Sequence, residues 1–339
     1  MILVTGGTGL VGAHLLWQLV QEEIPVRATY RDIRRLERVR RVFSYYTAQG
    51  DGFFEKIHWV EADINDLMAL ESAFDQVSQV YHCAAMISFD PGDFRQLRKV
   101  NAEGTANVVN LCLSRQVQKL CYASSIATIG KPLNDAPATE EDYGPDRQRN
   151  VYALSKLSAE MEVWRGAQEG LPVVIVNPGI ILGPGFWQGA SGRIFGIAAR
   201  GPSYAPPGGS GFVGVGDVVQ IMVQLMQSSI VNERFIVVAE QLSYRELLGM
   251  MAREFNKKGP AKTLPLWGLE ILWRLDWLRC LFGGGRRKLT KSNVASLKHP
   301  TLYVNGKIKE ALQYSFEPLK ESIIASCRHY DREHRKLSD

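Results

Sequence analysis

The sequence predicts an α/β protein in which a parallel sheet is covered by helices on both faces. Three observations support this fold class. Short apolar runs alternate with helical patterns from residue 2 to residue 176, a glycine loop joins the first run to the first helical pattern, and the sequence after Pro178 becomes rich in Gly and Pro. Alternation of strands and helices in this manner builds a doubly wound parallel sheet.

The individual elements follow from these patterns in chain order. We expect strands over residues 2–4, 26–30, 57–60, 80–83, 119–123, 173–176 and 235–238. We expect helices over residues 11–21, 33–46, 67–74, 94–114, 151–167 and 243–255. The last helix opens with Ser243 followed by Glu246, which is a capping box. Loops are expected to dominate from Pro178 to Gly216 because Gly and Pro are frequent there.

A chain of 339 residues is long enough for one large domain or two that pack closely together. We assign residues 1–180, with roughly 212–240, to the domain that holds the sheet. Residues 181–211 and 241–339 are assigned to a smaller, mostly helical C-terminal domain that would bind the substrate.

Composition excludes several other classes of protein. Hydrophobic residues make up 45% and charged residues 22% of the chain, as in ordinary globular proteins. The net charge of +5 is too small to predict a nucleic-acid partner, although basic residues gather at 27–41 and 286–298. Five cysteines without metal-ligand spacing predict reduced thiols in a cytoplasmic protein and no metal site. No apolar run reaches the roughly 20 residues of a membrane span, and the N-terminal residues resemble a buried strand more than a signal peptide.

A glycine loop near the N-terminus predicts a phosphate site. The loop T-G-G-T-G-L-V-G, residues 5–12, lies between the first strand and the first helix. A pyrophosphate needs backbone N–H groups at a helix N-terminus with no side chains in the way. Gly6 would make the tight turn, Gly9 would let the backbone approach the phosphates, and Gly12 would let the helix pack closely. In this position the motif favours a Rossmann dinucleotide site over a turn without ligand.

The second strand decides which dinucleotide is expected. An NAD site usually has an acidic residue at the end of this strand, which bonds the ribose 2′-OH. That place falls here at Tyr30 or Arg31, and Arg31 offers a fork of donors to a 2′-phosphate. Asp32 follows directly and keeps NAD as the alternative, whereas Arg34 and Arg35 are interpreted as a solvated helix face. We therefore favour NADP.

The catalytic candidates lie in the motif Y-A-L-S-K, which places Tyr152 and Lys156 on one face of a helix. A phenol has a pKa of about 10, and a nearby ammonium or oxidised nicotinamide lowers it. Tyr152 would exchange a proton with a substrate oxygen, and Lys156 would lower its pKa and hold the nicotinamide ribose. Ser125, after the fifth strand, would bond the same oxygen, and Ser124 is the weaker candidate. The Tyr and Lys alone would also fit an exposed helix face.

Seven motifs in a fixed order carry a family resemblance. They are T-G-G-T-G-L-V-G, E-A-D-I, H-C-A-A, V-N-A-E-G-T, A-S-S, Y-A-L-S-K and N-P-G. Over at least residues 1–185 the chain resembles the extended short-chain dehydrogenase/reductase family, the superfamily of NAD-dependent epimerases and dehydratases. The segment V-R-A-T-Y-R-D at 26–32 resembles its dihydroflavonol-reductase-type members, whose Arg recognises NADP. The resemblance implies a small-molecule substrate and a homodimer.

The resemblance also implies which residues bind the cofactor. Asp63 would bond the adenine amino group, and Ile64 would add a backbone contact. Asn101 would support the active-site water or the helix geometry. The complete set of cofactor-binding candidates is Thr5, Gly6, Thr8, Gly9, Leu10, Val11, Gly12, Arg31, Asp63, Ile64, Ala84, Ala85, Asn101, Tyr152, Lys156, Pro178, Ile180 and Ile181.

Three functions are compatible with these motifs. We favour an NAD(P)-dependent oxidoreductase that transfers hydride between nicotinamide and a carbonyl or alcohol. An NAD-dependent sugar epimerase is the alternative, and Asn177 disfavours it because many members have Arg there. Ser125 is followed by Ile126 and Ala127 where dehydratases have Asp-Glu, which disfavours elimination of water. A non-catalytic cofactor sensor is disfavoured because such relatives usually lack the Tyr and Lys.

One apolar segment, residues 264–282, stands outside this scheme. It carries Trp267, Trp273 and Trp277 among leucines, with charges scattered around the predicted helix. We interpret it first as a helix packed on the core of the substrate domain, next as a lid over a hydrophobic substrate, and last as a membrane-surface anchor followed by the basic residues 286–291.

Overall fold

The computed structural model describes residues 1–22, 24–132, 136–143, 149–283, 294, 297 and 301–335. Its centre is a seven-stranded sheet in which every pairing is parallel, with the order β10-β6-β5-β4-β1-β2-β3. The strands are β1 (Ile2–Thr5), β2 (Val26–Tyr30), β3 (His58–Glu61), β4 (Gln79–His82), β5 (Lys119–Ala123), β6 (Val173–Pro178) and β10 (Glu233–Val237). The predicted Rossmann sheet is confirmed.

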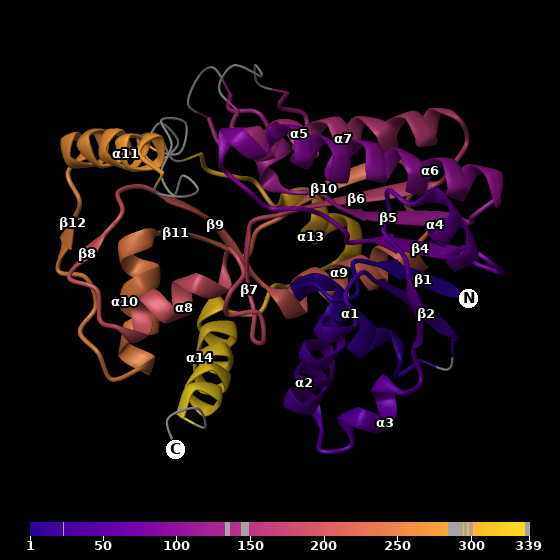
Figure 1. The fold of residues 1–339 in the computed structure, drawn as a ribbon, viewed down its shortest axis with the longest axis horizontal. Helices are drawn as coiled ribbons and strands as arrows, with labels where there is room; N and C mark the ends of the chain where they lie inside the picture. The colour runs from indigo at the N-terminus through magenta and orange to yellow at the C-terminus, as the bar shows by residue number, and fades with distance from the viewer. Residues whose placement is uncertain are drawn as a thin grey trace.

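Helices cover both faces of the sheet (Figure 1). On one face α1 (Leu10–Leu19), α2 (Leu36–Tyr46) and α9 (Val215–Gln227) form one hydrophobic cluster with the sheet. On the other face α4 (Leu67–Ala73), α6 (Gly104–Ser114) and α7 (Val151–Gln168) form a second cluster. Strands between two helical layers are buried on both sides, which is why β6 is buried along its whole length.

Three helical regions differ from the sequence prediction. The predicted helix 33–46 begins with a 3₁₀ turn, Ile33–Arg35, and a short helix α3 (Gly50–Phe54) follows it. The predicted helix 94–114 is three pieces: α5 (Phe94–Leu97), a π-helical turn (Arg98–Glu103) and α6. No helix was expected at α9, which packs against α1, β5 and β6 and exposes a stripe of Gln220, Gln224 and Gln227.

The smaller region contains more regular structure than predicted for residues 178–216. There β7 (Ile180–Leu182) and β9 (Gly209–Gly214) join β11 (Glu240–Ser243) in a three-stranded sheet, and β8 (Tyr204–Ala205) pairs with β12 (Lys262–Thr263). The expectation of loops was therefore only partly right, because several of the glycines lie in a strand. A Cβ at Gly209 would lie 2.3 Å from the Leu242 carbonyl oxygen, so close strand packing requires glycine there.

Helices α8 (Gly192–Ala199), α10 (Tyr244–Glu254) and α14 (Leu319–Arg335) share a third hydrophobic cluster with these strands. The predicted capping box at the start of α10 is confirmed, since Ser243 and Glu246 each bond the other's backbone N–H. Further along the chain, α13 (Gly306–Leu312) returns to the main sheet and packs against β10 and α9.

The apolar segment forms helix α11 (Leu266–Leu281), but its predicted packing on the core is wrong. Among the side chains of α11 that the structure describes, Leu269 is the one that is fully buried. No helix among the described ranges is both long and apolar enough to cross a membrane. The basic residues 286–291 lie outside the described residues.

Candidate active site

The glycine turn between β1 and α1 leaves its backbone uncovered. Gly6 has φ +73°, and a Cβ added there would lie 2.5 Å from the Ala84 backbone nitrogen. A Cβ on Gly12 would lie 2.3 Å from the Gly6 carbonyl oxygen, so both positions require glycine. Helix α1 is capped by Gly9 without a side-chain hydrogen bond, so its first N–H groups face no capping side chain. This is the geometry in which a helix N-terminus binds phosphate.

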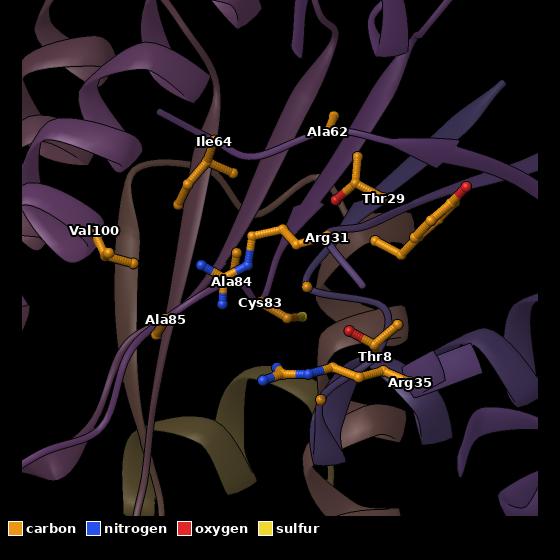
Figure 2. A pocket seen from close by; sticks show the side chains of 13 residues that line it. Thr8, Thr29, Arg31, Arg35, Ala62, Ile64, Cys83, Ala84, Ala85 and Val100 are labelled. Atoms are coloured by element: carbon orange, nitrogen blue, oxygen red, sulfur yellow. The ribbon is translucent and has the colours of Figure 1, made fainter. Parts of the chain in front are cut away.

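A pocket opens beside this turn, where strands β1 to β4 end (Figure 2). Seven predicted cofactor residues line it: Gly6, Thr8, Gly9, Arg31, Ile64, Ala84 and Ala85. Six more residues also line it: Thr29, Tyr30, Arg35, Ala62, Cys83 and Val100. Tyr30 and Cys83 end predicted strands, and Thr29 and Ala62 lie within two residues of a predicted strand end, so the rule that ligands bind at strand ends could have found these four.

Two arginines extend into the pocket (Figure 2). Arg31 lies 3.4 Å from Asp63, measured from Nη1 to Oδ2, and Arg35 reaches in from the 3₁₀ turn before α2. Arg35 was interpreted from the sequence as a solvated helix position, and it is exposed, but its side chain also lines the pocket. Asp32, in contrast, accepts two bonds from the Arg34 side chain at 2.9 and 3.0 Å. The guanidinium groups of Arg31 and Arg35 therefore line the pocket, whereas the Asp32 carboxylate is paired with Arg34.

The three catalytic candidates come together at the end of β5. Tyr152, in the first turn of α7, lies near enough to the Ser125 hydroxyl for that group to lower its pKa. One turn later, Lys156 is 1% exposed and its Nζ donates to the Ala123 carbonyl at 2.8 Å. The Lys156 ammonium also lies 4.3 Å above the centre of the Tyr122 ring. Asn150 starts the helix by capping it, since its Oδ1 accepts from Ala153 N at 2.8 Å.

Burial controls the protonation of this group. It raises the pKa of Tyr152 to about 12, which the nearby Ser125 hydroxyl partly offsets. Burial also lowers the pKa of Lys156 to about 7, although the Glu160 carboxylate opposes this shift. The sequence predicted that Lys156 would lower the pKa of Tyr152. In the protein without cofactor, burial prevails over that effect.

A family model fits this arrangement. The model described as "NAD dependent epimerase/dehydratase family" matches residues 2–239, which include the glycine turn, the pocket and the Tyr–Lys helix. The chain belongs to this family. Its members are NAD(P)-dependent reductases or epimerases, and the predicted resemblance to extended short-chain dehydrogenases is confirmed.

Curated proteins of the NAD dependent epimerase/dehydratase family resemble most of the chain. Sterol demethylase protein B of Methylococcus capsulatus is 30% identical over 267 residues, covering 78% of this chain and 77% of the relative. A putative dihydroflavonol 4-reductase of Synechocystis is 28% identical over 281 residues, covering 80% and 77%. The solved structure of gox2253 superposes with a TM-score of 0.82 at 26% identity over 99% of both chains. A Thermotoga maritima UDP-glucose 4-epimerase has a TM-score of 0.76 at 20% identity, which is evidence for the fold alone.

Other predicted residues of this family site lie beside the pocket rather than in its lining. Asn101, in the π-helical turn, bonds both backbone groups of Met86 and donates to Ser155 on α7 at 2.9 Å. It therefore joins the segment after β4 to the catalytic helix. Thr5 points to His82, with 2.6 Å between Oγ1 and Nδ1, and burial lowers the pKa of His82 to about 3.

The remaining candidates also lie outside the lining of that pocket. Leu10 and Val11 are half-buried in the first turn of α1, and Gly12 packs against the glycine turn. Asp63 meets the pocket through its ion pair with Arg31. Pro178 ends β6 and is buried, whereas Ile180 and Ile181 begin β7 and are half-buried. No group of His, Cys, Asp or Glu suited to hold a metal occurs in the part of the chain that the structure describes.

A buried polar network lies beneath the catalytic helix. Glu160, one turn after Lys156, forms an ion pair with Arg234 of β10 at 2.9 Å, and the two side chains are 1% and 3% exposed. The other Glu160 oxygen accepts hydrogen bonds from three residues: Ser124 at 2.6 Å, Thr128 at 2.9 Å and Asn177 at 3.0 Å. Ser124 and Asn177 are thus turned to this network, which agrees with Ser125 as the better catalytic candidate. Sequence analysis missed Glu160 and Arg234, because a Glu and an Arg 74 positions apart carry no local signal.

Proposed function

We propose that the chain is an NADP-dependent reductase or dehydrogenase acting on a carbonyl or alcohol. The observation that carries this proposal is the contact between Ser125 and Tyr152 at the end of β5, with the buried Lys156 one helical turn away. The proposal also rests on the adjoining pocket, where an uncovered helix N-terminus and two arginines suit a dinucleotide that carries phosphate groups.

Each residue has a distinct part in the proposed reaction. NADPH, when bound, supplies hydride to the substrate carbon. Tyr152 donates its phenolic proton to the substrate oxygen as negative charge develops there, and Ser125 bonds the same oxygen. Lys156, with a pKa of about 7, holds its ammonium against the Ala123 carbonyl and stabilises the phenolate that remains. In the reverse direction Tyr152 takes the proton back.

Arg31 and Arg35 support NADP as the preferred cofactor. A guanidinium fork suits a 2′-phosphate, whereas the acidic residue that would bond a ribose 2′-OH is replaced by Arg31. Asp32, which kept NAD open as an alternative, faces Arg34. Thr8, Ile64 and the Ala84–Ala85 backbone would complete the dinucleotide site, with Pro178, Ile180 and Ile181 at the nicotinamide end.

The substrate side supports an apolar molecule over a nucleotide sugar. The Phe89 ring packs edge-on against Tyr152 with 5.6 Å between ring centres, and Ile87 and Phe89 are both exposed. Asn177 is fully buried on Glu160, so it presents no polar group to a ligand. Relatives named dihydroflavonol 4-reductase and cinnamoyl-CoA reductase point to aromatic substrates. We further propose that the chain acts in the cytoplasm as a homodimer.

The cofactor proposal is tested by fluorescence titration of the purified protein with NADPH and NADH. We expect NADPH to bind at least tenfold more tightly. Removing a charged hydrogen bond costs about 1.5–3 kcal/mol, so Arg31→Ala and Arg35→Ala should each weaken NADPH binding about 10–100-fold and leave NADH nearly unchanged. Arg253→Ala, on α10, is the matched control. Tighter binding of NADH would refute the NADP assignment.

The catalytic proposal is tested with Tyr152→Phe. This variant should lose turnover across a panel of aromatic aldehydes and ketones while it binds NADPH as well as the parent does. Tyr204→Phe, an exposed tyrosine on β8, should keep full activity. Unchanged turnover in Tyr152→Phe would refute the mechanism. A cofactor that stays bound through purification and shows no net redox change with a nucleotide sugar would favour the epimerase instead.

A further inference from the structure

Helix α11 turns a stripe of large apolar side chains to the outside of the protein. Trp267, Ile271, Leu275, Leu278 and Phe282 are spaced by four, four, three and four residues, so they follow one face of the helix and its C-terminal cap. They are 70%, 49%, 55%, 39% and 85% exposed. Isolated exposed hydrophobic residues are normal, whereas a continuous exposed row marks an interaction surface.

The polar contacts of α11 lie beside and behind the apolar row. Glu270 accepts a hydrogen bond from Trp273 at 2.8 Å and forms an ion pair with Arg274 at 2.8 Å. Asp276 forms an ion pair with Arg279 at 2.9 Å, and Leu269 is buried against the protein. The two acidic side chains of α11 are therefore half-buried in ion pairs, whereas the large apolar side chains of the row are exposed, which is unusual for a surface helix. Figure 1 places α11 at the end of the molecule away from α4 and β2.

The sequence around the stripe is strongly basic. Between residues 256 and 291 there are nine Lys or Arg and two Asp or Glu, a net charge of +7. The whole chain carries +5, so the remaining residues together are net negative. Lys257, Lys258 and Lys262 are exposed in the segment that leads through β12 into α11. In the sequence, positive charge is therefore concentrated before and after the helix that carries the apolar row.

We propose that α11 docks on the surface of an anionic lipid bilayer. The apolar row would enter the boundary between headgroups and acyl chains, and the flanking cations would face lipid phosphates. Trp267, at the start of the row, suits that boundary because an indole has an apolar ring and a polar N–H. A second copy of the chain fits less well, because each copy carries a net charge of +7 in the sequence from residue 256 to residue 291, and like charges repel.

The helix would lie on the bilayer rather than cross it. Sixteen residues of helix extend for about 24 Å, less than the roughly 30 Å of a hydrocarbon core. Four charged side chains, Glu270, Arg274, Asp276 and Arg279, are distributed along it. Docking of this kind does not depend on the reaction proposed above.

The test is flotation of the 339-residue chain with liposomes. One set is pure phosphatidylcholine, and the other contains about 30% phosphatidylglycerol. We expect binding to the anionic vesicles, a blue shift of Trp fluorescence, and at least tenfold weaker binding to the neutral vesicles. Because each cation near an anionic surface contributes about fivefold, raising salt from 0.05 to 0.5 M should also weaken binding at least tenfold.

Two variants separate the apolar and the charged contributions. Trp267→Gln/Leu275→Gln/Leu278→Gln should reduce binding to anionic vesicles more than tenfold. Lys257→Gln/Lys258→Gln should reduce it about 25-fold, because two cations are removed. Leu67→Gln/Met68→Gln, which changes two exposed apolar residues of α4, is the matched control and should bind like the parent. Circular dichroism and NADPH titration check that each variant is folded.

The outcomes distinguish the possible occupants of the stripe. Binding that requires both anionic lipid and the α11 side chains supports the proposal. Absence of binding to anionic vesicles overturns it, as does equal loss of binding in the α4 control. Self-association in sedimentation velocity that the α11 triple variant abolishes, without vesicle binding, would identify a second copy as the occupant and also overturn the proposal.

Discussion

The ion pair between Arg234 and Glu160 is closed off from solvent, so removing one partner is expected to be costly. Replacing Arg234 by Met would leave the Glu160 carboxylate buried without its cation and would also remove the Arg234 contacts to the Glu140 carbonyl and the Tyr143 ring. Breaking a buried pair in this way costs about 3–5 kcal/mol. We expect the free energy of unfolding of Arg234→Met to fall by that amount.

The double variant Arg234→Met/Glu160→Leu is the informative comparison. It removes both charges, so no isolated ion is left in the interior. It still removes the acceptor of the Ser124 hydroxyl, at a cost on the order of 1–3 kcal/mol, whereas Thr128 and Asn177 keep hydrogen bonds to the Ser125 carbonyl. We therefore expect the double variant to be destabilised by at least about 1.5 kcal/mol less than the sum of the two single variants.

Equilibrium unfolding in urea, followed by far-UV circular dichroism, measures these differences. The matched control is Arg165→Met on the same helix, because Arg165 pairs with Glu162 and Glu169 while its side chain is 35% exposed. An exposed pair is worth about 0–1 kcal/mol, so this variant should be nearly as stable as the parent. If Arg234→Met costs no more than Arg165→Met, the reasoning about the buried pair is wrong.

Three further predictions concern the site itself. Gly12→Ala should abolish NADPH binding and lower the free energy of unfolding by about 1–3 kcal/mol, because its Cβ would lie 2.3 Å from the Gly6 carbonyl oxygen. In the control Gly52→Ala the new Cβ meets nothing within 4 Å, so neither the NADPH titration followed by fluorescence nor the urea midpoint should change. Burial raises the pKa of Cys83 to about 12, so little of this thiol is ionised at pH 8. Its alkylation by iodoacetamide, followed by mass spectrometry, should be far slower than that of glutathione, and equal rates would contradict this. Lys156 has a folded-state pKa of about 7 against 10.5 unfolded, so the unfolded state holds more protons between these values and stability rises with pH there. From pH 7 to 10, the free energy of unfolding of the parent should rise by up to about 1.4 kcal/mol per pH unit more than that of Lys156→Met, as measured by urea unfolding. An equal pH dependence in the parent and the variant would contradict the pKa shift.

The sheet could be predicted from sequence because its signals are local. The apolar run 119–123 matches β5 residue for residue, and the glycine loop identifies the β1–α1 turn. Helix α9 was missed although its exposed residues Gln220, Gln224 and Gln227 recur at helical spacing, so the signal was present in the sequence. Helix α11 shows a different error, since apolar composition predicts burial and the structure exposes the helix.

Site residues that belong to a local sequence motif could be predicted, whereas those that depend on contacts between distant residues could not. Ser125, Tyr152 and Lys156 could be chosen because strand ends and helix spacing place them on one side of the sheet. Arg35 could not be placed, because the 3₁₀ turn that directs its side chain into the pocket interrupts the expected helix periodicity. The Glu160 network required knowing that β10 pairs with β6, a contact between residues about 60 positions apart.

Helix α7 explains why polar residues are found where a sequence pattern predicts apolar ones. Its buried face includes Ser155, Lys156 and Glu160 beside Ala159 and Val163, so it has almost no amphipathic contrast. Burying an ammonium and a carboxylate costs stability unless each is bonded, and here the Ala123 carbonyl serves one and Arg234 the other. A core built for stability alone would hold apolar side chains at these positions. Because Glu160 opposes the fall in the pKa of Lys156, the same carboxylate that anchors β10 to α7 also keeps the amine protonated near neutral pH. Stability and proton chemistry are thus coupled through the Glu160 side chain. In Glu160→Gln the pKa of Lys156 should fall further, so activity that requires the Lys156 ammonium should be lost at a lower pH than in the parent.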